Sequence, residues 1–232
     1  MDTETRTTRF RIMRFYLDNG RPPTLEELTK SMDLAPETVW KSLKQLEDLH
    51  HLVLYKEGVP SPTPIAMIHP FSHLPTAYHL QCGDRSWWAN CPWCGFGLVS
   101  MLLRENAKSS IILRVLSGSR NDELQIEWRN GEMVTTGCKD YVAHFSVPPS
   151  KFWIDVRYTC STIQLFQSEI RAESWLRKHG VSKGALISFE QLLELAKEWY
   201  HDKAEYSYDR KSPEQIRELY NTLGMTEAFW KQ

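Results

Sequence analysis

The sequence predicts an α+β protein in which a winged-helix-like N-terminal unit precedes a mixed-sheet core. Three observations support this fold class. Apolar residues recur at helical spacing before residue 50, short strand-like segments follow between residues 111 and 145, and capped helical segments return after residue 188. The chain has 232 residues, 41% of them hydrophobic, and nine tryptophans, so we expect a sizeable core with a dense aromatic cluster.

The N-terminal unit is expected to span residues 1–58 and to contain three helices and a short strand. Thr24 and Glu27 form a capping box that begins the second helix. Pro36 is well placed as the first residue of the third helix, because its missing N–H is not needed there. A strand at residues 52–55 follows. Three helices and a strand in this order resemble a winged helix.

A winged helix raises the hypothesis of DNA binding, and the charge on its third helix decides against it. Lys41 and Lys44 are balanced by Glu37, Glu47 and Asp48. A helix that binds DNA normally neutralises several phosphates. The sequence therefore disfavours nucleic acid as a partner and favours a packing or lid role for this unit.

Residues 59–80 are expected to be a linker with three alternate prolines, followed by an edge strand at 77–80. His69 and His73 lie in this segment and suggest a metal site. Prolines interrupt the interval between them, so no helix presents both histidines on one face. We therefore disfavour metal ligation by these histidines.

Residues 81–232 are expected to form the core and the C-terminal helices. Turn residues and helix caps separate its elements. The expected strands cover residues 111–115, 124–128, 141–145 and 163–166, and the expected helices cover residues 91–103, 173–179, 188–199 and 212–223.

Three of the five cysteines lie in two aromatic and β-branched segments, and they are the main candidates for chemistry. Cys91 and Cys94 form a Cys-Pro-Trp-Cys motif at the start of an expected helix, and Cys160 follows about seventy residues later. Thiolates are nucleophiles and the preferred ligands of soft metals. Two thiols three residues apart can act on one atom. An inert buried thiol is the alternative for a single cysteine.

These segments resemble the organomercurial (alkylmercury) lyases. The similarity includes the Arg-Pro-Pro-Thr segment at residues 21–24, the segment at 88–91, and Cys160 with the residues after it. Those residues are Ile163, Phe166, Ala172, Glu173, Trp175 and His179. The resemblance implies a lyase-like core that needs no cofactor, acts on a small organometal, and holds mercury through Cys91 and Cys160.

The chain departs from the family pattern at residue 94. The resemblance implies protonolysis of a carbon–mercury bond, with a carboxylate three residues after the first cysteine relaying the proton. Cys94 stands at that position. A thiol, with a pKa of ~8.5, is a weaker acid than a carboxyl but is mostly protonated at neutral pH and can donate a proton. Afterwards Cys94 becomes a third metal ligand, so catalytic and metal-binding roles are both assigned to Cys91, Cys94 and Cys160. Asp84 and Asp155 are alternative proton relays.

Several other functions remain open at this stage. The chain could be a slower lyase, a protein that binds a soft metal ion (mercury, zinc or copper) through thiolates, or a relative with other chemistry. Zinc would need a fourth ligand from Cys82, Cys138 or a histidine. A thioredoxin-like redox role fits the Cys-x-x-Cys spacing but lacks a preceding βαβ unit. A winged-helix regulator is the main alternative from another class.

Composition limits the compartment and the partners. The formal net charge is −1, so no general basic surface indicates nucleic acid or a membrane surface as partner. We find no signal peptide and no apolar stretch of membrane-spanning length. Five cysteines without framework spacing argue against a disulfide-stapled secreted domain. We therefore expect a cytoplasmic protein with reduced thiols.

Overall fold

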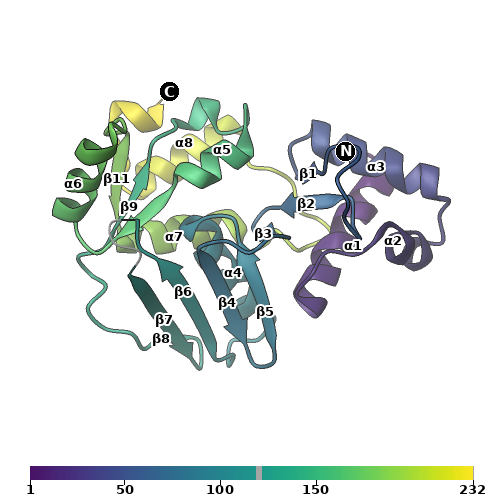
Figure 1. Ribbon diagram of the computed structural model, residues 1–232, viewed down its shortest axis with the longest axis horizontal. Coiled ribbons are helices and arrows are strands. Elements are labelled where there is room, and N and C mark those ends of the chain that lie inside the picture. Colours follow the sequence, from purple (N-terminus) through teal and green to yellow (C-terminus); the bar gives the residue numbers. More distant parts are fainter. Residues whose placement is uncertain (119–121, 232) are drawn as a thin grey trace.

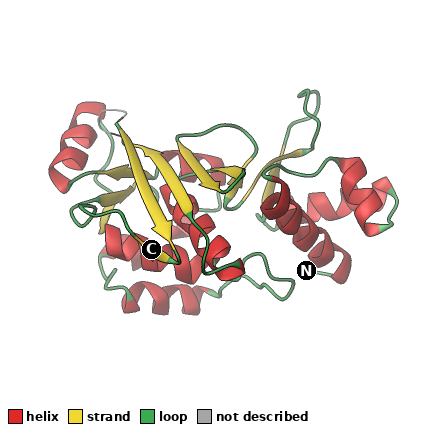
Figure 2. Cartoon of the chain, turned by 90° about the horizontal axis from the view of Figure 1, so that it is seen from below, coloured by secondary structure: helices red, strands yellow, loops and turns green. Residues whose placement is uncertain are grey.

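Two antiparallel sheets and the helices packed on them form the chain, in a computed structural model that describes residues 1–118 and 122–231. Figure 1 shows helices α1, α2 and α3 at one end and the smaller sheet with α6 at the other. The larger sheet lies between these ends, and the turned view in Figure 2 shows its strands beside the helices that cover them. The expected α+β class is confirmed.

The helices and strands have the following bounds. The helices are α1 (Thr3–Asn19), α2 (Leu25–Met32), α3 (Pro36–Asp48), α4 (Pro92–Glu105), α5 (Val156–Thr162), α6 (Glu169–His179), α7 (Phe189–Tyr200) and α8 (Pro213–Thr222), with short 3-10 helices η1 (Pro149–Lys151) and η2 (Ala228–Lys231). The strands are β1 (Leu52–Leu54), β2 (Ile65–Ile68), β3 (Phe71–Ser72), β4 (Tyr78–Cys82), β5 (Arg85–Ala89), β6 (Ile111–Leu116), β7 (Glu123–Arg129), β8 (Glu132–Met133), β9 (Val142–Phe145), β10 (Gln164–Phe166) and β11 (Ala185–Ser188).

The larger sheet has the strand order β1-β2-β3-β5-β4-β6-β7-β8, and the smaller sheet has the order β10-β9-β11. Every strand pairing among the described residues is antiparallel, so the prediction of a mixed sheet is wrong. Three neighbouring pairs of the larger sheet, β2–β3, β4–β5 and β7–β8, are joined by two-residue turns, and such connections produce antiparallel pairs.

The prediction of an edge strand at residues 77–80 is also wrong, because β4 lies between β5 and β6. The Trp-rich segment that forms β5 was not recognised as a strand, and its pairing with β4 moves β4 into the interior of the sheet. The segment expected to be a linker contains β2 and β3, which continue the sheet toward β1. Cys82, expected in a loop, is the last residue of β4.

The core helix α4 is almost entirely apolar and lies between β4–β6 of the sheet and α7. A helix that is hydrophobic all round is buried on all sides, which fits this position. Helix α7 begins at a capping box of Ser188 and Gln191 and presents Leu192, Leu195 and Trp199 to the core. Figure 1 shows α4 and α7 side by side behind the sheet.

Gly97 allows α4 and α7 to approach closely. A Cβ atom added at Gly97 would lie 2.3 Å from Cδ2 and 2.5 Å from Cγ of the Tyr200 ring. These atoms belong to the fixed base of a buried side chain, so the ring could not move aside without shifting α7. Gly97 therefore sets the distance between the two helices.

We expect Gly97→Ala to lower the free energy of unfolding. Overpacking of this kind costs about 1–3 kcal/mol, while the helix propensity of alanine returns up to about 1 kcal/mol. Urea unfolding followed by tryptophan fluorescence measures the difference. Ser100→Ala on the same helix is the matched control, and it should be neutral because Ser100 faces a surface groove. Equal stability of the two variants would contradict the close-packing role of Gly97.

Candidate active site

The three candidate thiols come together in the interior. Cys91 lies directly before α4, Cys94 is in the first turn of α4, and Cys160 is on α5. The backbone N–H of Cys94 donates to the Cys91 sulfur at 3.4 Å. The sulfurs of Cys94 and Cys160 and a ring nitrogen of His69 all lie within 4.8 Å of one another. Cys91 and Cys94 have no exposed surface, and Cys160 is 7% exposed.

The local sequence places Cys91 at the N-cap of α4. Cys91 has an extended backbone (φ −159°), and Pro92 occupies the first helical position, where no N–H donor is required. The Cys91 sulfur takes the place that a Ser or Asp oxygen usually has at an N-cap. The Cys-Pro-Trp-Cys motif thus places both of its sulfurs at the positive end of the α4 dipole, where negative charge is stabilised.

The neighbouring turn is held by Asn90. Its side-chain amide donates to the carbonyl oxygens of Pro70 and Phe71, both at 3.0 Å. These bonds connect the segment that ends at Cys91 to the turn that carries His69. His69 Nε2 lies 3.4 Å from the Cys160 sulfur. The prolines around His69, which led the sequence analysis to set it aside, therefore form the turn that brings it to the thiols.

Cys160 is presented by a short helix that the sequence analysis did not predict. Helix α5 begins at Asp155, whose carboxylate accepts the backbone N–H groups of Arg157 and Tyr158 at 3.0 and 3.1 Å. Asp155 is thus engaged as a helix cap. Asp84, the other proposed relay, lies in the turn between β4 and β5, at the opposite end of that hairpin from Cys91.

Aromatic side chains enclose the thiols. Trp93 contacts Trp199, Tyr200, Phe145 and Phe152, with ring centroids 5.0 to 6.1 Å apart. This is the dense aromatic cluster expected from the tryptophan content. It excludes water from the site, so electrostatic interactions there are stronger than at a surface.

The hydroxyl group of Tyr200 lies 3.3 Å from the Cys94 sulfur. Burial and the neighbouring thiol charges raise the pKa of Tyr200 well above its usual value, so the hydroxyl stays protonated and can donate to the sulfur. Sequence analysis missed Tyr200, because it lies at the end of an ordinary amphipathic helix.

The thiol pKa values diverge within the cluster. Burial raises the pKa of Cys91, and hydrogen bonds to Cys91 and Cys94, together with burial, raise that of Cys160. Burial acts in the same direction on Cys94. Hydrogen bonds with Cys160, Cys91 and the Tyr200 hydroxyl act against it, and the pKa of Cys94 is lowered well below its usual value. Cys94 is therefore the thiol of the cluster that loses its proton first, and Cys91 and Cys160 hold their protons more strongly.

His69 is neutral at physiological pH. Burial lowers its pKa to about 4, although the charge on Cys94 acts in the opposite direction. A neutral imidazole has one ring nitrogen free to bind a metal or accept a proton. His69 therefore forms a group of one nitrogen and two sulfur atoms with Cys94 and Cys160, and the Cys91 sulfur adjoins the two thiols of this group.

Cys82 and Cys138 are outside this group. Cys82 lies beside the β4–β5 turn, and the buried Cys138 is near Tyr141. All five cysteines are free thiols.

In the part of the chain that the structure describes, no helix is both long and apolar enough to cross a bilayer.

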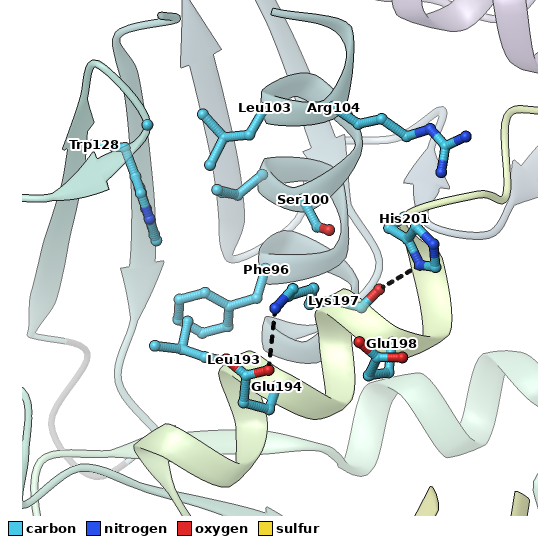
Figure 3. Close-up of a pocket in the computed structure, with 12 residues that line it drawn as sticks. Phe96, Ser100, Leu103, Arg104, Trp128, Leu193, Glu194, Lys197, Glu198 and His201 are labelled. Carbon is cyan, nitrogen blue, oxygen red and sulfur yellow. Dashed lines mark hydrogen bonds and ion pairs between the residues drawn. The ribbon is translucent and has the colours of Figure 1, made fainter. Parts of the chain in front are cut away.

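A surface groove of about 540 Å³ lies on another side of α4. Figure 3 shows Phe96, Ser100 and Leu103 of α4 facing Leu193 and Lys197 of α7 across it. None of the three clustered cysteines lines this groove. The cysteine cluster and this surface groove are thus separate sites.

Three comparisons place the chain among known proteins. Residues 71–201, more than half of the chain, match the family model described as MerB, alkylmercury lyase. A solved structure, the crystal structure of the mercury-bound form of MerB2, matches with a TM-score of 0.63 and 20% sequence identity, over 88% of this chain and 100% of that one. At this identity the likeness shows the fold. No curated protein matches the chain. The resemblance inferred from the cysteine segments is thus confirmed, and the chain belongs to the alkylmercury lyase family.

Proposed function

We propose that the chain is a carbon–mercury lyase that uses Cys91, Cys94 and Cys160 to bind an organomercurial and protonate its carbon–mercury bond. The observation that carries the proposal is the buried cluster of these three sulfurs in a chain of the alkylmercury lyase family. Sulfur is the preferred ligand of soft metals. The substrate is a small organometal, and no cofactor is required.

The charge distribution in the cluster suggests the order of steps. As mercury binds to the sulfurs of Cys91 and Cys160, these thiols lose their protons. One proton passes to the Cys94 thiolate and the other to solvent. Cys94 then gives its proton to the carbon, and the hydrocarbon leaves while both electrons of the carbon–mercury bond stay with the carbon. Cys94, again a thiolate, is left beside the mercuric ion.

This sequence of steps revises the role of Cys94. The sequence predicts an ordinary protonated thiol at Cys94, whereas the lowered pKa favours a thiolate there in the resting site. It can therefore act first as the base that accepts a proton from a neighbouring thiol and then as the acid. The Tyr200 hydroxyl fixes the Cys94 sulfur in this position.

Metal storage is the second candidate function, and His69 favours it. His69, Cys94 and Cys160 bring one nitrogen and two sulfurs within 4.8 Å of one another, and with the adjoining Cys91 they are the residue types of structural zinc sites. His69 Nε2 lies beside the Cys160 sulfur and within reach of an ion held by Cys94. Under this alternative the protein would bind mercury, zinc or copper without releasing a hydrocarbon.

We further propose that residues 1–58 form a winged-helix-like unit with a packing role, that residues 59–80 connect it, and that residues 81–232 form the lyase-like core. Helices α1–α3 followed by the antiparallel β1–β2 pair support this division. Helix α3 uses its charges internally, since Glu47 pairs with Lys44 at 3.2 Å and accepts the Leu54 N–H at 2.9 Å.

The five free thiols support a cytoplasmic location.

We expect the reduced protein to release methane from methylmercury, and Cys91→Ser or Cys160→Ser to lower the rate at least about 100-fold, because each removes a soft-metal ligand. Gas chromatography of the headspace measures release, and mass spectrometry of the protein measures bound mercury. Cys82→Ser is the matched control and should keep the activity. Binding without methane release would support metal storage, and neither binding nor release by a folded protein would contradict both proposals.

Cys94→Asp should release methane faster and retain mercury less tightly. It places a carboxyl, a stronger acid, at the position that the family pattern assigns to one, and it removes a sulfur ligand. The first turn of α4 also favours a carboxylate through the helix dipole. Single-turnover release and competition for mercury with glutathione measure the two effects. An unchanged or lower release rate, with an active parent protein, would show that Cys94 has its own catalytic role.

The proposed packing role of residues 1–58 predicts weak retention on heparin at low salt. The α3 helix has balanced charge, and nonspecific DNA binding requires several unpaired cations. The full chain should elute near the void volume, as should a Lys41→Gln variant. Tight retention that falls steeply with salt, and that Lys41→Gln weakens, would favour the regulator instead.

A further inference from the structure

A buried lysine lies next to the thiol cluster. Lys203 follows α7 by three residues and is 6% exposed. Among the described residues no carboxylate lies within ion-pair distance of its ammonium group. Burying a charge without a partner is costly, so such lysines are rare unless a compensating charge is near.

The thiols can compensate this charge. The Lys203 Nζ lies 4.9 Å from the centroid of the Tyr200 ring, and the hydroxyl of the same ring contacts the Cys94 sulfur. Charges on Cys94 and Cys160 both act on the lysine. The ammonium and the Cys94 sulfur thus both contact Tyr200, the ammonium at the ring and the sulfur at the hydroxyl, and all three residues are buried.

The N-terminal unit fixes the lysine in this place. Arg9 of α1 donates to the carbonyl oxygen of Lys203 at 2.6 Å and to that of Glu205. Arg210 donates to the carbonyl oxygens of Leu49 and His50 at 2.7 and 3.0 Å. The segment that carries Lys203 is therefore bonded to the N-terminal unit at two points, which is consistent with the packing role proposed for that unit.

Charge arithmetic connects the lysine to mercury. One mercuric ion held by two thiolates is neutral, whereas an ion held by three thiolates has one negative charge. With Cys94 as the resting thiolate of the proposed mechanism, binding by all three sulfurs releases two protons, and the complex has the same single negative charge as the resting cluster. A lone negative charge in a water-poor site is unfavourable without a cation. A single buried ammonium provides one positive charge.

We propose that Lys203 is a positioning residue that neutralises a three-sulfur mercury complex, so that this site holds mercuric ion through Cys91, Cys94 and Cys160 together. The inference rests on the proposed function in that mercury is the bound metal. The inference adds that three sulfurs bind the mercuric ion, and that Lys203 is the residue that favours three sulfur ligands over two.

The groups facing Lys203 are consistent with this role. Burial lowers the pKa of Lys203 to about 7, the Cys94 charge acts to raise it, and Arg210 and Arg9 act to lower it. His51 also faces it, and burial lowers the pKa of His51 to about 3, which leaves that imidazole neutral. The phenol groups of Tyr200 and Tyr208 are beside it and carry no charge at neutral pH. The single negative charge that the cluster has both before and after mercury binds should therefore hold the lysine in its ammonium form.

The test is the coordination number of mercury in the full chain. Mercuric chloride is added below one equivalent, so that the tightest site fills first, and X-ray absorption at the mercury edge counts the sulfur neighbours. We expect three sulfurs in the parent protein, two in Lys203→Met, and three again in Lys203→Arg, which restores the charge. Lys197→Met is the matched control, since Lys197 is exposed on α7, and it should keep three sulfurs. Two sulfurs in the parent, or three in Lys203→Met, would overturn the inference.

A second measurement needs no destabilising variant. Lysine labelled with nitrogen-15 in its side chain gives the pKa of Lys203 by NMR, with the signal assigned by its loss in Lys203→Arg. We expect this pKa to stay within about one unit when mercuric ion binds, because the three-sulfur complex has the same charge as the resting cluster. A fall of more than about one unit, which a neutral two-sulfur complex would cause, would overturn the inference. Both measurements use an ion without a carbon–mercury bond, so they remain informative even if methylmercury is not cleaved.

Discussion

The close contact between α4 and α7 at Gly97 is the constraint on which the site depends. It lets the Tyr200 ring lie directly on α4, so that the ring's hydroxyl reaches the Cys94 sulfur one turn earlier in that helix. The same contact brings the end of α7, and Lys203 after it, close to the thiols. A larger residue at position 97 would separate the two helices. The sulfur cluster would then lie farther from the Tyr200 hydroxyl and from the Lys203 ammonium.

Burial explains why one thiol of the cluster is more acidic than the other two. In water three thiols would titrate almost independently, whereas in this aromatic enclosure a single thiolate is stabilised by the two thiols that bond to it. The helix dipole of α4 contributes in the same direction, because both motif sulfurs are at its N-terminus. A resting site with one base and two acids is suited to moving a proton as metal binds.

The replacement of a carboxylate by a thiol at position 94 changes the balance between turnover and retention. A third sulfur can carry a proton to carbon, and it also remains as a ligand for the ion that is left. The N-terminal unit affects the same balance from a distance, because Arg9 and Arg210 join it to the segment that bears Lys203. Residues far from the sulfurs in sequence thus contribute to the charge around them.

The family, the α+β class and the candidate cysteines can be inferred from the sequence, because these depend on local patterns. The Cys-Pro-Trp-Cys motif specifies its own helix start, and capping boxes mark α2 and α7. The antiparallel pairing, the interior place of β4, and the partners of the thiols depend on contacts between distant segments. His69, Tyr200 and Lys203 have no motif in common, and they meet the cysteines only because a proline-containing turn and a helix–helix contact bring distant segments together. Local patterns do not encode such distances, so the electrostatics of the site could not be predicted from the chain alone.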